Sequence, residues 1–293
     1  MANVNETVSG ACRFLDDSYF RALHETFVAA FSDYVVPFAL TETQFLNHIV
    51  LNGVDLNRSV GWLIADRLVG FSLNGFGTWN GCSTVYDAGT GVIPEKRRCG
   101  ISLAMFNMML QRFRDDGIKQ FLLEVVTSNA AAISLYEKLG FRIVRSLSLL
   151  QCDERLKSDK EMPPGVDLRP MEKPEWELFR TFWDTEPSWQ NSVDALNRSN
   201  KVKRLIGAWI ADRCVGYIVF SSASGRLAQL AVAHDHRHSG IGTSLVRAMQ
   251  AETAEGFSLQ VINIDSANIG AITFFNRLGF YERISQHEML MAM

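Results

Sequence analysis

The chain has 293 residues, of which 47% are hydrophobic and 21% are charged, and its formal net charge is −3. This composition is typical of a globular protein, and the length suits about two domains of ordinary size. A slightly acidic chain argues against a nucleic-acid partner or an anionic membrane surface, because both favour basic proteins. A cationic partner molecule suits the charge better.

The cysteines are odd in number and scattered along the chain, without a Cys-x-x-Cys pair: Cys12, Cys82, Cys99, Cys152 and Cys214. Such a set predicts neither a disulfide framework nor a zinc site, and it favours a reducing compartment. Residues 1–10 lack the features of a signal peptide, and no apolar run reaches the roughly 20 residues of a membrane-spanning helix. We therefore expect a cytoplasmic protein with no membrane partner.

A short strand near Cys12 opens the predicted order of elements. Asp16 or Asp17 then caps a helix whose apolar residues recur every three or four positions, at Phe20, Leu23, Phe27, Ala30 and Phe31. We expect this helix to end near residues 32–37. Thr41 and Gln44 have the spacing of a capping box, which predicts a second helix.

Strands at 60–65 and 68–73 flank Asp66-Arg67, which predicts a hairpin. The next strand, 84–93, contains Ala88, Gly89 and Gly91, and glycine inside a strand indicates a bulge or the close approach of a ligand. A helix follows from Gly100 to about Gly117. Its methionines are expected to fill the core: Met105, Met108 and Met109.

A buried strand at 121–126, a helix from Asn129 to Gly140 and a final strand to about residue 151 complete the first half. Residues 152–165 are charged and close with Pro163-Pro164-Gly165, which predicts a linker.

The second half repeats the first. Residues 232–242 repeat the pattern of 92–102, and the helix motif that begins at Asn129 recurs at Asn268, 139 residues later. The hairpin returns at Asp212-Arg213. This repetition predicts two copies of one fold, at 1–151 and 166–293, joined by the linker.

Residues 92–102 run from a strand through a short basic loop into a helix. Backbone N–H groups at a helix start lack intrahelical partners, and the helix dipole favours negative charge there. Gly100 and Ser102 leave these groups unshielded, and Arg97 and Arg98 add positive charge. We interpret the loop as a diphosphate site; the alternative is an ordinary strand-to-helix turn with solvated arginines.

These motifs resemble those of the GNAT superfamily of acyl-CoA-dependent N-acyltransferases, namely the loop [Gln/Arg]-x-x-Gly-x-[Gly/Ala] and the helix Asn-x-x-Ala-x-x-Leu-Tyr-x-x-x-Gly-Phe. Ser102 stands where the family prefers Gly or Ala, and its small hydroxyl still lets a phosphate approach. The resemblance covers nearly the whole chain, twice. It implies a mixed α+β fold of two tandem GNAT domains, each with a mostly antiparallel, splayed central sheet flanked by helices.

The resemblance also implies that acetyl-CoA binds as a cosubstrate at the first loop, through Val92, Arg97, Arg98, Cys99, Gly100, Ile101, Ser102 and Asn129. The matching second candidate CoA site comprises Val232, Arg237, His238, Ser239, Gly240, Ile241, Gly242 and Asn268. In the family, the helix-loop-helix region that here spans 31–53 shapes the acceptor pocket.

Acyl transfer to an amine needs a base to deprotonate the ammonium and an acid to protonate the leaving thiolate. Glu124 lies inside an apolar strand, a costly position unless the group is paired or protonated. Its motif and that of Tyr136 resemble the ribosomal-protein alanine N-acetyltransferases, which implies Glu124 as base and Tyr136 as acid. Asp87 is the reserve base. The alternatives are a structural ion pair for Glu124 and a core position for Tyr136.

The second copy has Asn263 and Phe275 at these two positions, and neither can act as an acid or a base. We therefore expect catalysis in the N-terminal copy and a C-terminal copy that is not catalytic. One alternative is a non-catalytic acyl-CoA-binding or interaction protein. Another is catalysis in the C-terminal copy, as in the two-domain mycothiol synthases.

Three histidines alternate through the second loop, at His234, His236 and His238. Alternate loop residues need not converge and no cysteine cluster joins them, so we expect no metal. The acceptor is expected to be a small-molecule or peptide amine. The sequence does not choose between these classes, nor does it indicate the oligomeric state.

Overall fold

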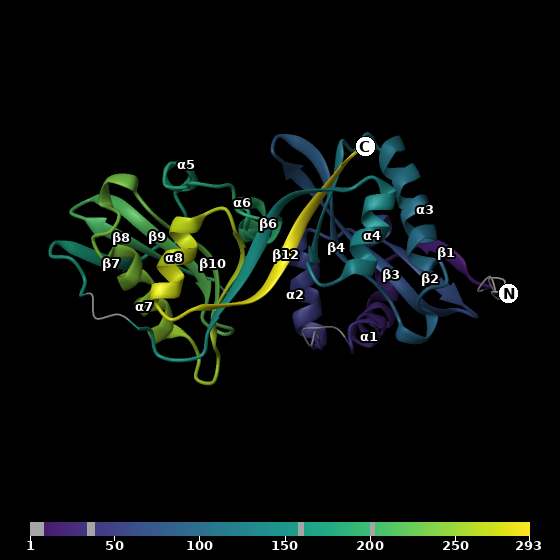
Figure 1. Ribbon diagram of the computed structural model, residues 1–293, viewed down its shortest axis with the longest axis horizontal. Helices are drawn as coiled ribbons and strands as arrows, with labels where there is room; N and C mark the ends of the chain where they lie inside the picture. The colour runs from purple at the N-terminus through teal and green to yellow at the C-terminus, as the bar shows by residue number, and fades with distance from the viewer. Residues whose placement is uncertain (1–8, 34–38, 158–160, 200–202) are drawn as a thin grey trace. The chain divides into compact units, whose positions relative to one another are not determined.

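The computed structural model describes residues 9–33, 39–157, 161–199 and 203–293 (Figure 1). The chain divides into two compact units. The N-terminal unit contains the residues up to Val125 together with Asn129–Ile143 and Met289–Met293, and the C-terminal unit contains Val126–Ser128 and Val144–Glu288.

The N-terminal unit is built on a sheet of five consecutive strands: β1 (Ala11–Phe14), β2 (Val60–Ile64), β3 (Arg67–Trp79), β4 (Cys82–Val92) and β5 (Gln120–Val126). Neighbouring strands are antiparallel except β4 and β5, which are parallel. Helices α1 (Phe20–Ala30) and α2 (Glu42–Asn52) cover one face, and α3 (Ile101–Asp115) and α4 (Ala130–Leu139) cover the other (Figure 1).

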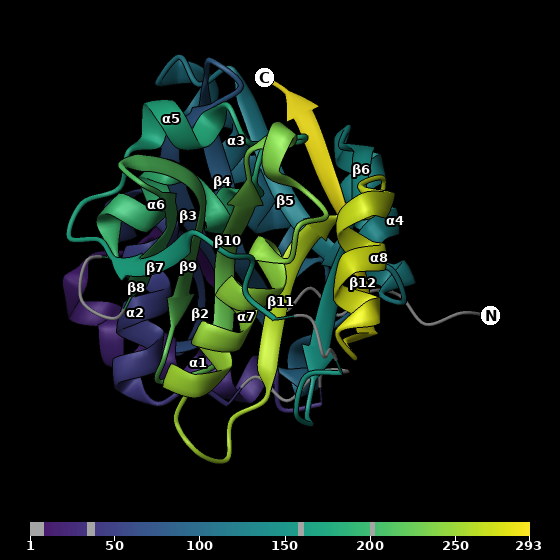
Figure 2. The same ribbon diagram turned by 90° about the vertical axis from the view of Figure 1, so that its left-hand side faces the viewer.

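The C-terminal unit has the sheet order β6-β11-β10-β9-β8-β7. Its strands are β6 (Arg142–Cys152), β7 (Val166–Pro170), β8 (Arg204–Ile210), β9 (Arg213–Ser221), β10 (Arg226–Val232) and β11 (Leu259–Asp265). Helices α5 (Trp176–Arg180) and α6 (Val193–Arg198) lie on one face, and α7 (Ile241–Glu252) and α8 (Ile269–Arg277) lie on the other (Figure 2). The chain ends with β12 (Tyr281–Ala292).

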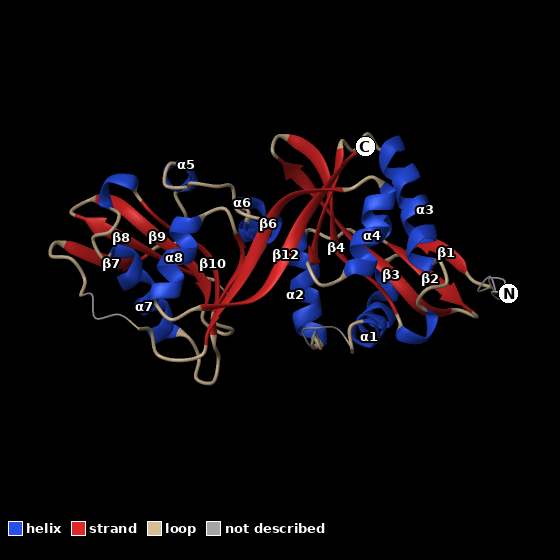
Figure 3. Cartoon of the chain, viewed as in Figure 1, coloured by secondary structure: helices blue, strands red, loops and turns tan. Residues whose placement is uncertain are grey.

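The two halves follow the same order of elements: a strand, two helices, three strands, a helix, a strand, a helix and a strand (Figure 3). Short 3₁₀ turns precede α3 and α7 at matching places, Pro94–Lys96 and His234–His236. The duplication and the mixed, mostly antiparallel fold predicted from the sequence are confirmed.

Parts of the last strands of the two copies do not stay with their own copy. Residues 144–152 of β6 belong to the C-terminal unit, where residues 147–152 pair antiparallel with β11 and Cys152 lies opposite Leu259. Met289 and Met291 at the end of β12 are buried in the core of the N-terminal unit. The units are therefore not separated by a single cut in the predicted linker, because strand pairing and core packing decide where residues 144–151 and 289–293 belong.

Local signals predicted the helix starts well. Thr41 and Gln44 form the capping box of α2, and Asn129 caps α4 by accepting from the Ala132 N–H at 3.2 Å. Asp16 caps a 3₁₀ turn instead of α1, which begins only at Phe20. Of the expected end of this helix near 32–37, residues 34–37 lie outside the described residues.

Strand β3 is much longer than the predicted segment 68–73 because Asn74 and Gly75 do not form a turn. After a shift of register between Leu73 and Asn74, the strand continues to pair with β4 as far as Trp79 opposite Cys82. Gly75 is needed there because a Cβ would overlap the Asn52 carbonyl oxygen at the end of α2. No helix within the described residues is long and apolar enough to cross a bilayer.

Candidate active site and its second copy

The parallel strands of the N-terminal unit separate halfway along β4. Their pairing runs from Thr84 opposite Gln120 to Asp87 opposite Leu123. The register between β3 and β4 shifts at the same level, which makes Ala88 an extra, bulged residue. The bulge expected from the small residues of this strand is therefore present, and it lies where the sheet splays.

The loop before α3 presents an open helix N-terminus. Gly100 is the N-cap residue with a φ of 77°, and Arg98 also has a positive φ of 62°. A Cβ added to Gly100 would meet no atom of the described residues within 4 Å. Unpaired backbone N–H groups beside such open space fit a diphosphate.

The Arg97 side chain is bound within the protein. Its guanidinium forms two hydrogen bonds of 2.7 Å to the Asp33 carboxylate and donates to the backbone oxygens of Ala30 at 2.8 Å and Val92 at 3.1 Å. The hydrogen bond from Arg97 lowers the pKa of Asp33. Arg97 thus attaches the loop to the end of α1, and we expect a diphosphate to meet backbone N–H groups and the exposed Arg98 instead.

Asp87 is the buried carboxyl group of the splay. It accepts hydrogen bonds from the Gly89 N–H at 2.9 Å, from the Thr90 hydroxyl at 2.8 Å and from the Tyr136 hydroxyl. Burial raises the pKa of Asp87 to about 6, although these hydrogen bonds act in the opposite direction. The structure therefore brings the reserve base into direct contact with the predicted acid.

Tyr136 is 8% exposed and packs among aromatic side chains of its unit. The ring centroids of Phe106 and Phe141 each lie 5.7 Å from its own. This packing fixes the ring, while the hydroxyl reaches Asp87. Tyr136 thus combines a ring packed in the core, the position considered as an alternative, with a hydroxyl that bonds a carboxylate.

Glu124 is the first residue of β5 beyond its last pair with β4. Its neighbours Leu123 and Val125 belong to the core cluster that contains α3. Because successive side chains of a strand alternate, half-buried Glu124 lies on the other face, toward α1 and α2. Glu124 and the Asp87–Tyr136 pair thus flank the splay from opposite faces of the sheet.

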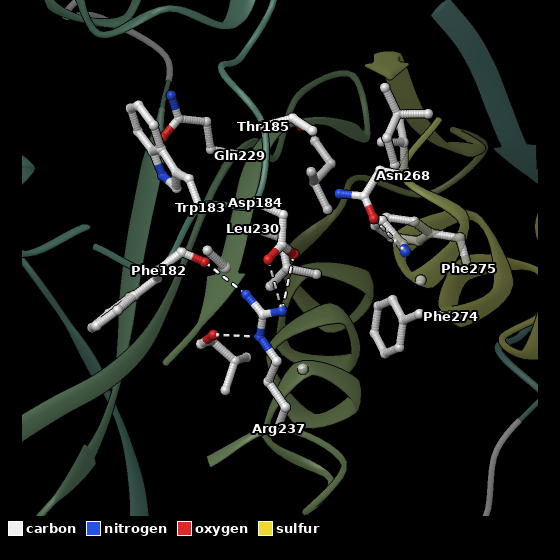
Figure 4. A pocket seen from close by; sticks show the side chains of 18 of the residues that line it. Phe182, Trp183, Asp184, Thr185, Gln229, Leu230, Arg237, Asn268, Phe274 and Phe275 are labelled. Carbon is white, nitrogen blue, oxygen red and sulfur yellow. Dashed lines mark hydrogen bonds and ion pairs between the residues drawn. The ribbon is translucent and has the colours of Figure 1, made fainter. Parts of the chain in front are cut away.

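The second loop repeats the first in detail. His238 and Gly240 have positive φ values of 61° and 106°, as Arg98 and Gly100 do. Arg237 pairs with Asp184 at 2.9 Å. It also donates to the backbone oxygens of Phe182 at 2.8 Å and Val232 at 3.1 Å (Figure 4).

Sequence profiles agree with this duplication. The acetyltransferase (GNAT) family profile matches residues 16–141, and an acetyltransferase (GNAT) domain profile matches residues 204–282. The chain belongs to the GNAT family, with two GNAT domains in tandem. Membership indicates an acyltransferase, and GNAT domains use acetyl-CoA.

Solved structures show the same tandem fold. A GCN5-related N-acetyltransferase from Sphaerobacter thermophilus is 16% identical, with a TM-score of 0.73 over 97% of this chain and 95% of that one. A tandem GNAT protein from the clavulanic acid biosynthesis pathway is 14% identical, with a TM-score of 0.73 over 96% and 98%. A GCN5-related N-acetyltransferase from Anabaena variabilis is 16% identical, with a TM-score of 0.57 over 96% and 72%. No curated protein sequence matches the chain.

The C-terminal GNAT domain contains a cavity of about 740 Å³. It is lined by seven residues of the second candidate CoA site: Val232, Arg237, His238, Gly240, Ile241, Gly242 and Asn268. Ser239 is exposed, with its hydroxyl on the His236 carbonyl at 2.6 Å. Asn268 caps α8 through the Ala271 N–H, and Phe274 and Phe275 project from the same helix (Figure 4). A cavity of this size is typical of a ligand site.

Two differences separate the GNAT domains. Leu227, Asn263 and Phe275 replace Asp87, Glu124 and Tyr136, so none of these positions carries an ionisable group in the second copy. The connecting segment also covers the second loop, because the Glu161 carbonyl oxygen lies 3.1 Å from where a Cβ of Gly240 would be. The second loop is therefore less open than the first.

The histidines of the second loop make contacts within the loop region. A ring nitrogen of His234 lies 3.9 Å from Asp184, and one of His236 lies 3.6 Å from Asp235. The described residues contain no group of three or more His, Cys, Asp or Glu side chains that could hold a metal ion. All five cysteines are free, and Cys99 is exposed in the first loop.

One polar contact of the first splay was not predicted from the sequence. His48 on α2 bonds the carbonyl oxygen of the bulged residue Ala88 at 2.7 Å. A histidine within a predicted helix is the only signal for it in the sequence, and that signal does not identify its partner. Asp33, the partner of Arg97, was also missed, because the two residues are 64 positions apart.

Proposed function

We propose that this protein transfers the acetyl group of acetyl-CoA to a primary amine and that its N-terminal GNAT domain carries the reaction. The observation that carries the proposal is the hydrogen-bonded pair of Asp87 and Tyr136 at the splay. The pair lies in the half whose helix N-terminus is open at Gly100. In the second copy, Leu227 and Phe275 take the places of Asp87 and Tyr136. At these matched positions, ionisable side chains are thus present in the N-terminal half only.

In the proposed reaction the amine nitrogen attacks the carbonyl carbon of the thioester, the C–N bond forms and the C–S bond breaks. Glu124, directly or through a water molecule, takes a proton from the incoming ammonium. Tyr136 gives its proton to the departing thiolate, and the second proton that the amine nitrogen loses as the amide forms restores the Tyr136 hydroxyl. Asp87 holds the Tyr136 hydroxyl in place and is the second carboxylate able to accept a proton. The proposed acceptor is a small-molecule or peptide amine.

Thiol release from acetyl-CoA in the presence of an amine panel tests the proposal. Glu124→Gln keeps the side-chain size and should lower kcat by about 10²–10⁴, with partial recovery at high pH where free amine is available. Tyr136→Phe should lower kcat by about two orders of magnitude and leave acetyl-CoA binding almost unchanged. The matched Phe275→Tyr variant should behave as the wild type.

Two outcomes would redirect the assignment. Normal turnover in Glu124→Gln together with an inactive Asp87→Asn would make Asp87 the base. Absence of thiol release by the wild type with every amine of the panel would count against an enzyme and favour a binding protein.

The cavity of the C-terminal domain favours a second role, the binding of acyl-CoA without turnover. Its volume of about 740 Å³ suits a large ligand, and the positions of base and acid are Asn263 and Phe275. Calorimetric titration with acetyl-CoA distinguishes the cases. Two sites per chain would support this second role, and one site that Gly100→Trp abolishes would restrict acetyl-CoA to the first loop.

A further inference from the structure

His48 is held in one orientation on α2. Its Nε2 lies 2.7 Å from the Ala88 carbonyl oxygen, which can only accept, so Nε2 carries the proton. Its Nδ1 lies 3.2 Å from the side-chain nitrogen of Asn52, which therefore donates to it. The same Asn52 nitrogen donates to the His48 carbonyl oxygen at 2.8 Å. The imidazole is thus oriented from both sides.

The oxygen that His48 binds belongs to the one residue that the bulge adds to β4. Leu73 pairs with Gly89 and Asn74 pairs with Asp87, so Ala88 lies between two ladder positions without a residue opposite it. Ala88 is 7% exposed, and a buried carbonyl group needs a hydrogen-bond donor. His48 supplies that donor from the covering helix.

The bulge in turn determines where the Asp87 carboxylate lies. Two of the groups that donate hydrogen bonds to this carboxylate, the Gly89 N–H and the Thr90 hydroxyl, belong to residues that directly follow Ala88 in the chain. A change in the Ala88 peptide therefore moves these donors relative to the carboxylate. We propose that His48 is a positioning residue, which fixes the β4 bulge and through it the alignment of Asp87 with Tyr136. The role in turnover rests on the proposed function.

The second copy attaches its bulge in another way. Ala228 is the bulged residue of β10, between Leu227 and Gln229. There the side-chain amide of Gln229, on the strand, donates to the Asn191 carbonyl oxygen at 2.6 Å. The donor is thus on the strand, whereas in the first copy it is His48 on the helix that covers the strand. The histidine contact is thus a feature of the half that has the ionisable pair.

Three variants test the role of His48. His48→Phe keeps a ring without a donor, and His48→Gln keeps a side-chain N–H. His24→Phe is the matched control, since His24 also bonds a backbone oxygen, that of Leu40 at 2.6 Å, but does not touch the bulge. We expect His48→Phe to lower kcat by roughly 10- to 100-fold with less than about a twofold change in the KM for acetyl-CoA, because small misplacements are costly in catalysis. His48→Gln should recover most of the loss.

A second measurement does not depend on turnover. Carbon-13 NMR titration of the Asp87 carboxyl should give a lower midpoint in His48→Phe, because a loosened bulge admits water, and the wild-type midpoint in His48→Gln and His24→Phe. An unchanged midpoint in a folded His48→Phe protein would overturn the positioning role, and so would a His48→Gln variant as altered as His48→Phe. A wild type without thiol release would instead count against the proposed function, and the titration would still decide the role of His48.

Discussion

The carboxyl group of Asp87 gives the site a titration near neutral pH. Because burial raises its pKa to about 6, the group is protonated below that pH and ionised above it. Asp87 can accept a proton only when it is ionised, so kcat/KM should rise with pH through a midpoint near 6. A pH–rate profile of the wild type and of Asp87→Asn checks this. A limb near this pH that persists in Asp87→Asn would belong to another group.

The same shift predicts a change of stability with pH. A carboxyl pKa raised in the folded state, from 3.8 to about 6, favours folding below pH 3.8, and this contribution is lost as the pH rises through about 6. Asp87→Asn should therefore gain stability relative to the wild type between pH 4 and pH 8, by at most about 3 kcal/mol. Urea denaturation of both proteins at the two pH values measures the gain. A difference that does not vary with pH would contradict the shifted pKa.

At the scale of elements, the first loop depends on Arg97. Its guanidinium connects the loop to α1 through Asp33, which is 54% exposed, and through the backbone oxygens of Ala30 and Val92. Exposed ion pairs contribute little, so Asp33→Asn should cost less than about 1 kcal/mol. Arg97→Ala also leaves two backbone oxygens without this donor and should cost about 1–3 kcal/mol.

The kinetic effect of Arg97→Ala should be selective. A loosened loop raises the KM for acetyl-CoA more than the KM for the acceptor, because the lost contacts mainly reduce uniform donor binding. Chemical denaturation and initial rates of Arg97→Ala and Asp33→Asn test both expectations. Equal behaviour of the two variants would mean that the ion pair alone fixes the loop.

Signals carried by consecutive residues predicted most elements. The capping box of Thr41 and Gln44, the Asn129 cap and the repeated loops depend on local backbone geometry and can be read directly. Contacts between distant residues could not be predicted. Tertiary packing alone chooses Asp33 for Arg97 and Ala88 for His48, so no local pattern records either pair.

At the scale of the whole chain, the exchange of final strands couples the end of the sequence to the first domain. Met289 and Met291 are 0% and 5% exposed in the N-terminal core, and the Met293 N–H donates to the Lys119 carbonyl oxygen at 2.9 Å. Periodicity did not predict this exchange, because an alternating pattern indicates a strand but does not identify the strand that it pairs with. The sequence similarity of the two copies identifies equivalent strands, but it does not show which strands pair with one another.

The exchange makes the N-terminal unit sensitive to the last residues. Met289→Ala should destabilise it by about 2–5 kcal/mol, the usual cost of a cavity in a packed core. Met162→Ala, at a side chain that is 46% exposed, is the control and should change stability by less than about 0.5 kcal/mol. Thermal unfolding of both variants measures the effect. Equal stability would show that the N-terminal core does not depend on the last strand.

Thiol release by two matched variants shows most directly which GNAT domain is catalytic. Ser102→Asp and Gly242→Asp each place a carboxylate at the second residue of the helix after a loop, α3 or α7. The N-terminus of a helix tolerates a negative charge, but the added carboxylate would repel a bound diphosphate. Since a Cβ on Gly242 lies 3.2 Å from the Phe274 ring, Gly242→Ala serves as the packing control.

Catalysis in the N-terminal domain predicts that Ser102→Asp raises the KM for acetyl-CoA by about tenfold or more, while Gly242→Asp stays within about twofold of Gly242→Ala. Turnover that is lost in Gly242→Asp and kept in Ser102→Asp would contradict this division and assign the reaction to the C-terminal domain.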